Sequence, residues 1–185
     1  MINEVREETE GKMRSSIEAL RRDLATIRTG RASLAILDNI RVDYYGNLTP
    51  LNQVATLSIP EPRLITIQPW ESSLIPVIEK ALQTSDLGVS PNNDGKIIRI
   101  PIPQLTEERR GEMVKRIKAM GEDARISIRN QRRDGIEDLK AFEKEKEISE
   151  DDLHRGQEQI QKLTDSYIAK VQELVEIKEK DVMTV

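Results

Sequence analysis

Hydrophobic residues recur at helical spacing in the first segment of the chain. From Thr9 to Ile27 they are separated by three or four positions, which places them on one stripe of a helix. The members of the stripe are Thr9, Met13, Ile17, Leu20, Leu24 and Ile27. The pattern predicts one amphipathic helix that ends before Thr29 and Gly30.

The pattern changes to short β-prone runs after Gly30. All eight prolines lie between residues 30 and 103. Within this region Leu74 to Leu87 has the spacing of one short helix, with Gly88 where a C-cap would fall. The β-prone runs are Ile40 to Tyr45, Ala55 to Ile59, Leu64 to Pro69 and Lys96 to Ile102. We expect this region to form a small β/α/β domain.

Helical spacing returns after Leu105 and continues almost to the C-terminus. Thr106 offers an N-cap for a long helix through Phe142, and Ser149 begins another with acidic residues in its first turn. The last stripe comprises Leu153, Ile160, Leu163, Tyr167, Val171, Leu174 and Ile177. Two helices of about 50 to 60 Å with narrow apolar stripes need helical partners, which favours a bundle.

The simplest topology is an elongated three-helix bundle with a domain inserted between helices one and two, an α+β fold. Residues 1–29 and 105–185 would form the bundle, and residues 30–104 the inserted β/α/β domain. The chain then crosses between the domains twice, and two adjacent short crossings would let the small domain swing as a unit. The expected hinge residues are Thr29, Gly30, Arg31, Pro103, Gln104 and Leu105.

Composition supports thin, elongated packing. Of 185 residues 34% are charged, 37% are hydrophobic and 3% are aromatic, which leaves little material for a thick core. The formal net charge of -4 argues against disorder driven by charge. With no cysteine, a disulfide framework, a Cys-based zinc site and a thiol nucleophile are excluded. No apolar run reaches the roughly 20 residues of a membrane span, and the first residues lack a signal-peptide pattern, so we expect a cytoplasmic protein.

Candidate catalytic groups are few. His154 is the one histidine and has no partner at an interpretable spacing, so we expect an exposed helix residue. The acid pairs at 107–108 and 151–152 fit first-turn acids better than catalytic carboxylates, because adjacent helix residues do not face each other. The segment 92–95 lacks the ligand spacing of an EF-hand and predicts a tight turn. We expect no catalytic residue, no metal site and no cofactor.

Basic residues are concentrated in the second long helix. Between Met113 and Arg133 there are seven positive and two negative residues, whereas between Glu143 and Asp165 there are four positive and eight negative. Four arginines fall within roughly a 100° arc, centred roughly 120° from the apolar seam. They are Arg125, Arg129, Arg132 and Arg133, and no acid occupies that arc between 125 and 133. The planar guanidinium fork suits phosphate, which favours a strip that binds nucleic acid.

Aromatic residues add little to that interpretation. None lies among the arginines of the strip, so RNA contacts are expected at phosphates and through shape. Trp70 and Tyr44 or Tyr45 are expected to pack the small domain. Two classes remain open from the residues alone: an RNA-binding protein with a jointed lever, and a non-catalytic coiled-coil adaptor for a protein partner. Affinity that falls steeply with salt would distinguish the first from the second.

Ten short motifs follow one another along nearly the whole chain. They span Ile27 to Ala32, Val42 to Gly46, Thr49 to Gln53, Glu79 to Ala81, Ser85 to Gly88, Ile98 to Pro103, Leu105 to Arg110, Arg129 to Asp134, Glu147 to Asp151 and Gln161 to Asp165. Taken together, the chain resembles the bacterial ribosome recycling factor family from end to end.

This resemblance implies an L-shaped outline that resembles tRNA, with a bundle arm and a small arm joined by a flexible hinge. It implies a translation factor that is not an enzyme. With elongation factor G and GTP, such a protein splits the post-termination ribosome and releases it from mRNA for a new round of synthesis. GTP would be bound by elongation factor G, and this chain would be a monomer that needs no cofactor.

The resemblance also implies that the bundle lies on large-subunit rRNA through phosphate contacts. By motif match, the first candidate for these phosphate contacts is Arg132. The supporting candidates are Arg129, Arg133, Arg28, Arg31, Arg110 and, from the strip, Arg125. The chain departs from the family at Gln131, where an apolar residue is usual. Three glycines, at 111, 121 and 135, are expected to weaken the second helix by about 1 kcal/mol each relative to alanine.

Overall fold

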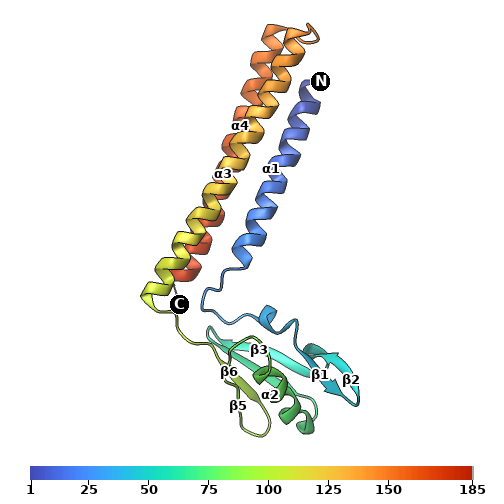
Figure 1. Cartoon of the computed structure of the whole chain (residues 1–185), viewed down its shortest axis with the longest axis vertical. Coiled ribbons are helices and arrows are strands. Elements are labelled where there is room, and N and C mark those ends of the chain that lie inside the picture. Colours follow the sequence, from blue (N-terminus) through green and yellow to red (C-terminus); the bar gives the residue numbers. More distant parts are fainter. Residues whose placement is uncertain (185) are drawn as a thin grey trace. The chain divides into compact units, whose positions relative to one another are not determined.

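The computed structural model describes residues 1–184, which divide into two compact units (Figure 1). Met1–Arg28 and Glu107–Thr184 form a helical unit, and Thr29–Thr106 form a small α/β unit inserted between them in sequence. Within residues 1–184, no helix has the length and apolar character needed to cross a membrane.

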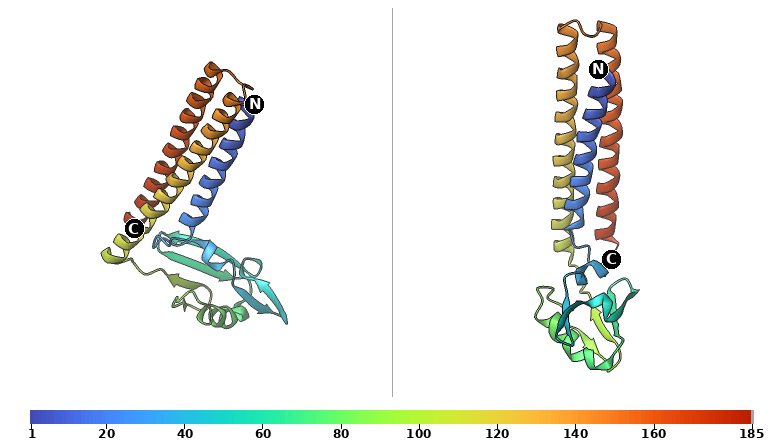
Figure 2. Two further views of the ribbon diagram at one scale, coloured as in Figure 1. Left: turned by 45° about the horizontal axis from the view of Figure 1, so that its top comes forward. Right: turned by 90° about the vertical axis from the view of Figure 1, so that its right-hand side faces the viewer.

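The helical unit is a bundle of three long helices that run side by side (Figures 1 and 2). They are α1 (Ile2–Ala25), α3 (Glu107–Lys144) and α4 (Glu150–Met183), and each packs against the other two. Helix α4 begins at a capping box: Ser149 Oγ accepts a hydrogen bond from Asp152 N at 3.1 Å, and the Asp152 carboxylate accepts one from Ser149 N at 3.3 Å. The predicted three-helix bundle is confirmed.

The bundle core follows the predicted stripes with one correction. Met13, Ile117, Ile128 and Val171 are fully buried, and each belongs to the apolar side of its helix. Ile177, expected in the last stripe, is instead 53% exposed. The buried side of α4 continues to Val175, four residues after Val171, and to Val182, seven residues after Val175. The three-residue step from Leu174 to Ile177 therefore turns away from the core.

Glycines occupy the places where the helices approach most closely. A Cβ on Gly121 would lie 2.6 Å from Val175 Cγ2, and one on Gly156 would lie 2.7 Å from Leu139 Cδ1. At Gly135 a Cβ would lie 2.5 Å from Thr9 Oγ1 and 3.2 Å from Ile160 Cδ1, so all three helices meet there. Gly121 and Gly135 therefore permit close packing, a role that the expected cost in helix propensity did not include. Gly111 has open space around it.

The small unit is built on a four-stranded antiparallel sheet with the order β3-β4-β6-β5. These strands are β3 (Ala55–Glu61), β4 (Leu64–Pro69), β5 (Asn92–Asn93) and β6 (Ile98–Pro101), and a separate hairpin pairs β1 (Arg41–Tyr44) with β2 (Asn47–Pro50). Alternate residues of β4 and β6 are buried as cross-strand pairs, Ile65 with Ile100 and Ile67 with Ile98. The strands β2 and β5 were not predicted, because one ends at a proline and the other has only two residues.

Helix α2 (Ile75–Gln83) covers this core with Ile75, Ile78 and Leu82. It follows a short 3-10 turn, η3 (Ser72–Leu74), and two further turns are η1 (Leu34–Leu37) and η2 (Leu51–Gln53). The predicted helix to Leu87 is too long. The hydroxyl of Thr84 donates to Lys80 O at 2.9 Å and that of Ser85 to Leu82 O at 2.6 Å, so side chains satisfy the last carbonyls and end the helix early.

Of the aromatic side chains expected to pack the small unit, Tyr44 does so and Trp70 does not, which corrects the expectation for Trp70. Tyr44 packs against the core, but Tyr45 is 79% exposed and Trp70 is 65% exposed. Both tyrosine hydroxyls donate to the Glu71 carboxylate at 3.0 Å, which raises the pKa of both phenols. Trp70 Nε1 donates to Thr56 Oγ1 at 3.1 Å.

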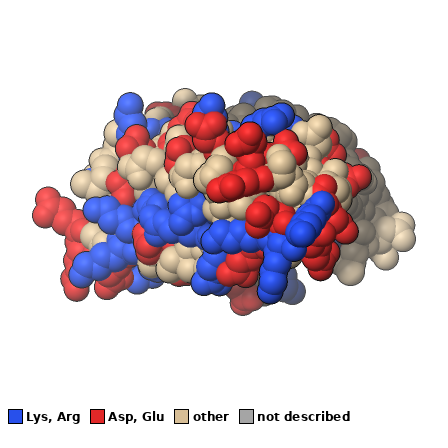
Figure 3. Space-filling model, turned by 90° about the horizontal axis from the view of Figure 1, so that it is seen from above, with Lys and Arg blue, Asp and Glu red and all other residues tan. Residues whose placement is uncertain are grey.

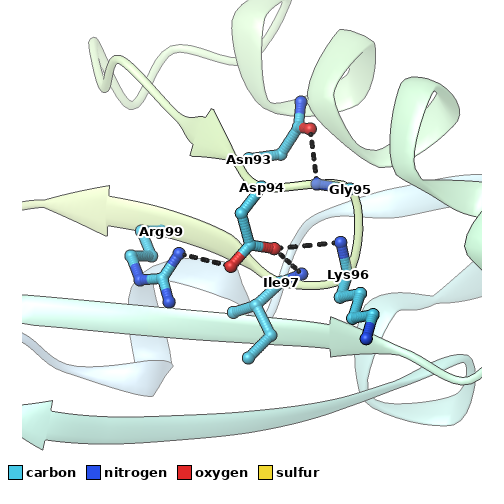
Figure 4. Close-up of polar contacts among 6 residues, drawn as sticks. All are labelled: Asn93, Asp94, Gly95, Lys96, Ile97 and Arg99. Carbon is cyan, nitrogen blue, oxygen red and sulfur yellow. Dashed lines mark hydrogen bonds and ion pairs between the residues drawn. The ribbon is translucent and has the colours of Figure 1, made fainter.

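The predicted tight turn at 92–95 closes the hairpin of β5 and β6 (Figure 4). The Asp94 carboxylate accepts hydrogen bonds from Ile97 N at 2.8 Å and Lys96 N at 2.9 Å, and it pairs with Arg99 Nη1 at 2.9 Å. The Ile97 amide, then the Arg99 guanidinium and the Lys96 amide, hold the pKa of Asp94 well below its usual range. The loop is therefore a structural turn whose carboxylate is already fully engaged.

Replacing Gly135 by alanine is expected to lower the free energy of unfolding by about 1–3 kcal/mol, because the new methyl group overpacks against Thr9 and Ile160. Gly111→Ala is the matched control on the same helix, and there alanine should raise stability by up to about 1 kcal/mol through helix propensity. Denaturant unfolding followed by helical circular dichroism measures both. Equal stabilisation by the two substitutions would contradict the close approach at Gly135.

Asp94→Asn keeps an acceptor oxygen in the turn but removes its charge, so the small unit should be less stable than wild type at pH 7. Because the pKa of Asp94 is lower in the folded state, its contribution is present above the unfolded value of about 3.9 and is lost as pH falls further. The stability difference should therefore shrink below about pH 4. Urea unfolding followed by fluorescence of the single tryptophan, Trp70, reports on this unit. A difference that is constant from pH 7 to pH 3 would contradict the prediction.

Candidate nucleic-acid interface

The predicted arginine strip lies on the middle of α3. Arg125, Arg129, Arg132 and Arg133 alternate along the helix with the buried residues that face α1 and α4. Those buried residues are Ala124, Ile128 and Gly135. Arg129 and Arg133 are exposed, whereas Arg125 and Arg132 are half-buried at the edge of the packed face, so only part of the strip faces solvent fully.

An acidic residue one turn before the strip changes its charge. Glu122 Oε2 pairs with Arg125 Nε at 3.2 Å, and Glu122 Oε1 pairs with Arg129 Nη1 at 3.4 Å. The window from 125 to 133 contains no acid within the arc, as expected, but Glu122 reaches into it from outside. The Arg125 side chain is also only 19% exposed. The first half of the strip is therefore partly neutralised and partly covered.

The second half of the strip keeps its positive charge. Arg132 Nη1 donates to Gln161 Oε1 on α4 at 3.2 Å, and within residues 1–184 Arg132 forms no ion pair with a carboxylate. Arg133 is exposed, and its Nε lies 3.9 Å from Asp134 Oδ1, at the outer limit of an ion pair. Exposed pairs of this length contribute little, so both guanidinium groups remain available to an external anion.

The residue before Arg132, Gln131, joins α3 to α1. Gln131 Nε2 donates to Ser16 Oγ on α1 at 2.8 Å, and the side chain is half-buried, as its predicted place near the seam requires. Its Oε1 is buried and has no hydrogen-bond partner among the described residues. Adjacent residues of α3 thus reach both neighbouring helices, Gln131 to α1 and Arg132 to α4.

The remaining predicted contact residues are not gathered at the strip. Arg110 lies in the first turns of α3, roughly 20 Å from Arg125 along the helix. Arg28 is exposed just after α1, and Arg31 is exposed within the small unit. Four of the seven predicted arginines therefore share one helix face and three lie elsewhere in the chain.

The predicted hinge residues belong to the small unit and include one close contact. Gly30 has φ +76°, and a Cβ on it would lie 3.0 Å from Leu105 Cγ, so the two crossings of the chain touch. Just inside the crossings, Ala32 N donates to Pro62 O at 2.7 Å and Ile102 N donates to Arg63 O at 2.8 Å. Both ends of the small unit are thus fastened to the same turn, between β3 and β4.

The end-on view shows positive side chains in a broken band that acidic side chains flank and interrupt (Figure 3).

A groove of about 830 Å³ lies between α3 and α4, lined by Ile136 and Gln161 and by the exposed His154. His154 Nε2 is 3.9 Å from Glu150 Oε1, one turn earlier on the same helix. This confirms the prediction that His154 is an exposed helix residue.

By fold, the chain is a three-helix bundle with a small α/β domain inserted in its first connection. The family profile of ribosome recycling factor matches residues 20–183. The ribosome-recycling factor of Chloroflexus aurantiacus is 54% identical over 185 residues, covering all of both chains. That of Geobacter metallireducens is 56% identical with the same coverage. The chain therefore belongs to the ribosome recycling factor family, whose members are translation factors and not classical enzymes.

Solved structures of the family share the fold. The solution structure of a ribosome recycling factor is 40% identical, with a TM-score of 0.71, and the match covers 100% of this chain and 98% of that one. The T. thermophilus ribosome recycling factor, in a structure with E. coli elongation factor G on the E. coli post-termination complex, is 43% identical. Its TM-score is 0.62, and 99% of each chain is covered.

Proposed function

We propose that this chain acts with elongation factor G and GTP to disassemble the post-termination ribosome and free it from mRNA for another round of protein synthesis. Membership of the family along the full chain supports this role. The T. thermophilus relative in complex with elongation factor G and the post-termination complex supports the choice of partners. In this proposal GTP is bound by elongation factor G, and the chain works in the cytoplasm as a monomer without a cofactor.

The bundle docks on large-subunit rRNA through the arginine strip, and the observation that carries this step is the state of Arg132. Its guanidinium is held by a neutral amide oxygen at 3.2 Å, so its charge is not cancelled. A planar guanidinium fork binds phosphate oxygens through two parallel hydrogen bonds. Arg133 adds a second exposed charge next to it, whereas Arg125 and Arg129 share Glu122 and contribute less.

The small unit is the part that moves during disassembly. Its two ends are fastened at Ala32 and Ile102 to the turn between β3 and β4, which supports a hinge outside these hydrogen bonds, at residues 29–31 and 103–105. Gly30, at φ +76°, allows a backbone conformation that other residues adopt with strain. A force from elongation factor G on the small unit would then be transmitted to a bundle that rRNA contacts hold in place.

Sedimentation of post-termination ribosomes with this protein, elongation factor G and GTP tests the proposal. Wild type should split the ribosomes into subunits. Arg132→Glu should lose large-subunit binding by at least about tenfold, because it removes a phosphate contact and adds repulsion. Arg21→Glu, an equal charge change at an exposed position on α1, is the matched control and should split ribosomes normally.

Three results are distinguishable. Loss of splitting with Arg132→Glu alone supports both the function and the docking strip. Splitting by all three proteins retains the recycling function and overturns the docking residue. Absence of splitting by folded wild type with homologous components overturns the proposed function and favours an adaptor that binds a protein partner.

A further inference from the structure

The hydrogen bond between Arg132 and Gln161 joins two helices at the centre of the proposed docking strip. Arg132 belongs to α3 and Gln161 to α4, and the Nη1 to Oε1 distance is 3.2 Å. Gln161 lies outside the strip by sequence, and it opens the motif that runs from Gln161 to Asp165. The docking proposal assigns RNA contact to Arg132 and its neighbouring arginines and gives no role to Gln161, so the function of this residue needs its own account.

Asp165 determines which end of the Gln161 amide faces the arginine. Gln161 Nε2 donates to Asp165 Oδ1 at 2.9 Å, one turn further along α4. An ionised carboxylate can only accept hydrogen bonds, so the amide nitrogen must point toward Asp165. The amide oxygen then points toward Arg132, which can only donate. The three side chains form a chain in which each group has one consistent orientation.

The backbone beneath these side chains is packed into the bundle. Thr164, between Gln161 and Asp165, is fully buried and donates its hydroxyl to Ile160 O at 2.7 Å. Ile160 packs at Gly135, where a Cβ would lie 3.2 Å away, and Gly135 is one turn beyond Arg132. The close approach of α3 and α4 at this layer sets the distance that the Arg132 to Gln161 hydrogen bond spans.

The neutral oxygen of Gln161 orients the guanidinium without cancelling its charge. The Glu122 pairs show the alternative, because a carboxylate there binds Arg125 and Arg129 directly. Asp165 acts one residue further away, through the amide. A guanidinium has five N–H donors, and the bond to Gln161 uses one of them. Phosphate can therefore meet a charged and already oriented fork, which reduces the ordering cost of binding.

We propose that Gln161, oriented by Asp165, is a positioning residue that holds the Arg132 guanidinium in the geometry for an RNA phosphate. This inference rests on the proposed docking function of Arg132. Gln161 would act by orienting the guanidinium and would add no charge of its own, whereas Arg132 would contact the phosphate directly. It also assigns a purpose to the Gln161 to Asp165 motif at the surface of α4.

A double-mutant cycle on large-subunit binding tests the positioning role with Gln161→Met, Arg132→Ala and the double variant. Gln161→Met should weaken binding by about three- to tenfold in the wild-type background and have no effect in the Arg132→Ala background. Arg132→Ala should lower the salt-dependence slope by about one, whereas Gln161→Met should leave that slope unchanged. Asp165→Asn, which no longer fixes the amide, should fall between wild type and Gln161→Met.

A second glutamine on the same helix provides the matched control. Gln172 Nε2 donates to Glu176 Oε1 at 2.7 Å, with the same i to i+4 geometry, and no arginine hydrogen bond reaches it among residues 1–184. Gln172→Met should therefore bind the large subunit like wild type. Thermal unfolding of both methionine variants, expected to be unchanged, checks that the bundle is intact.

The outcomes separate this inference from the proposed function. Weakened binding by Gln161→Met that vanishes without Arg132 supports positioning. An equal loss in both backgrounds overturns it in favour of a direct contact or a fold defect. No loss with Gln161→Met, when Arg132→Ala does weaken binding, overturns the positioning role and leaves the docking strip. No loss with Arg132→Ala overturns the docking strip and the positioning role together.

Discussion

Close approach between three long helices is the constraint on which the rest of the helical unit depends. With 37% hydrophobic and 3% aromatic residues, the chain cannot fill a wide core, so the helices must come close together. Glycines at 121, 135 and 156 permit this, since a Cβ at each would meet a neighbouring side chain at 2.5–2.7 Å. The spacing of α3 and α4 at Gly135 also decides whether Arg132 can reach Gln161. Packing and the surface chemistry of the strip are thus set by the same residues.

The surrounding groups divide a strip of four chemically equal arginines into two kinds. A carboxylate at Glu122 binds the first two, and an amide at Gln161 holds the third while leaving its charge intact. This difference explains how a chain with nearly balanced charge, 29 basic and 33 acidic residues, can keep local positive charge at Arg132 and Arg133, on which the proposed phosphate contact depends. The proposed function then needs no pocket and no catalytic group, because in that proposal rRNA contacts hold the bundle while the small unit moves.

The sequence predicted the helices, the main strands and the strip because each depends on local periodicity. It missed contacts that depend on tertiary structure. Hydrophobic patterns do not count glycine as an interior residue, so they could not predict the packing role of Gly135. The exposure of Ile177 depends on which face of α4 the two partner helices cover, and the pattern of α4 alone does not give that face. The pairing of Glu122 with the strip could have been predicted by extending the search for acids from 125–133 one turn toward the N-terminus. Gln161 lies 29 residues from Arg132, and no local signal joins them.

A cryo-electron microscopy structure of this chain on the post-termination ribosome tests the central claim most directly. The account predicts that the α3 face carrying Arg132 and Arg133 lies on large-subunit rRNA. Arg132 should be within about 3 Å of a phosphate oxygen while still bonded to Gln161. A complex in which this face is turned to solvent, or covered by ribosomal protein alone, would contradict the account.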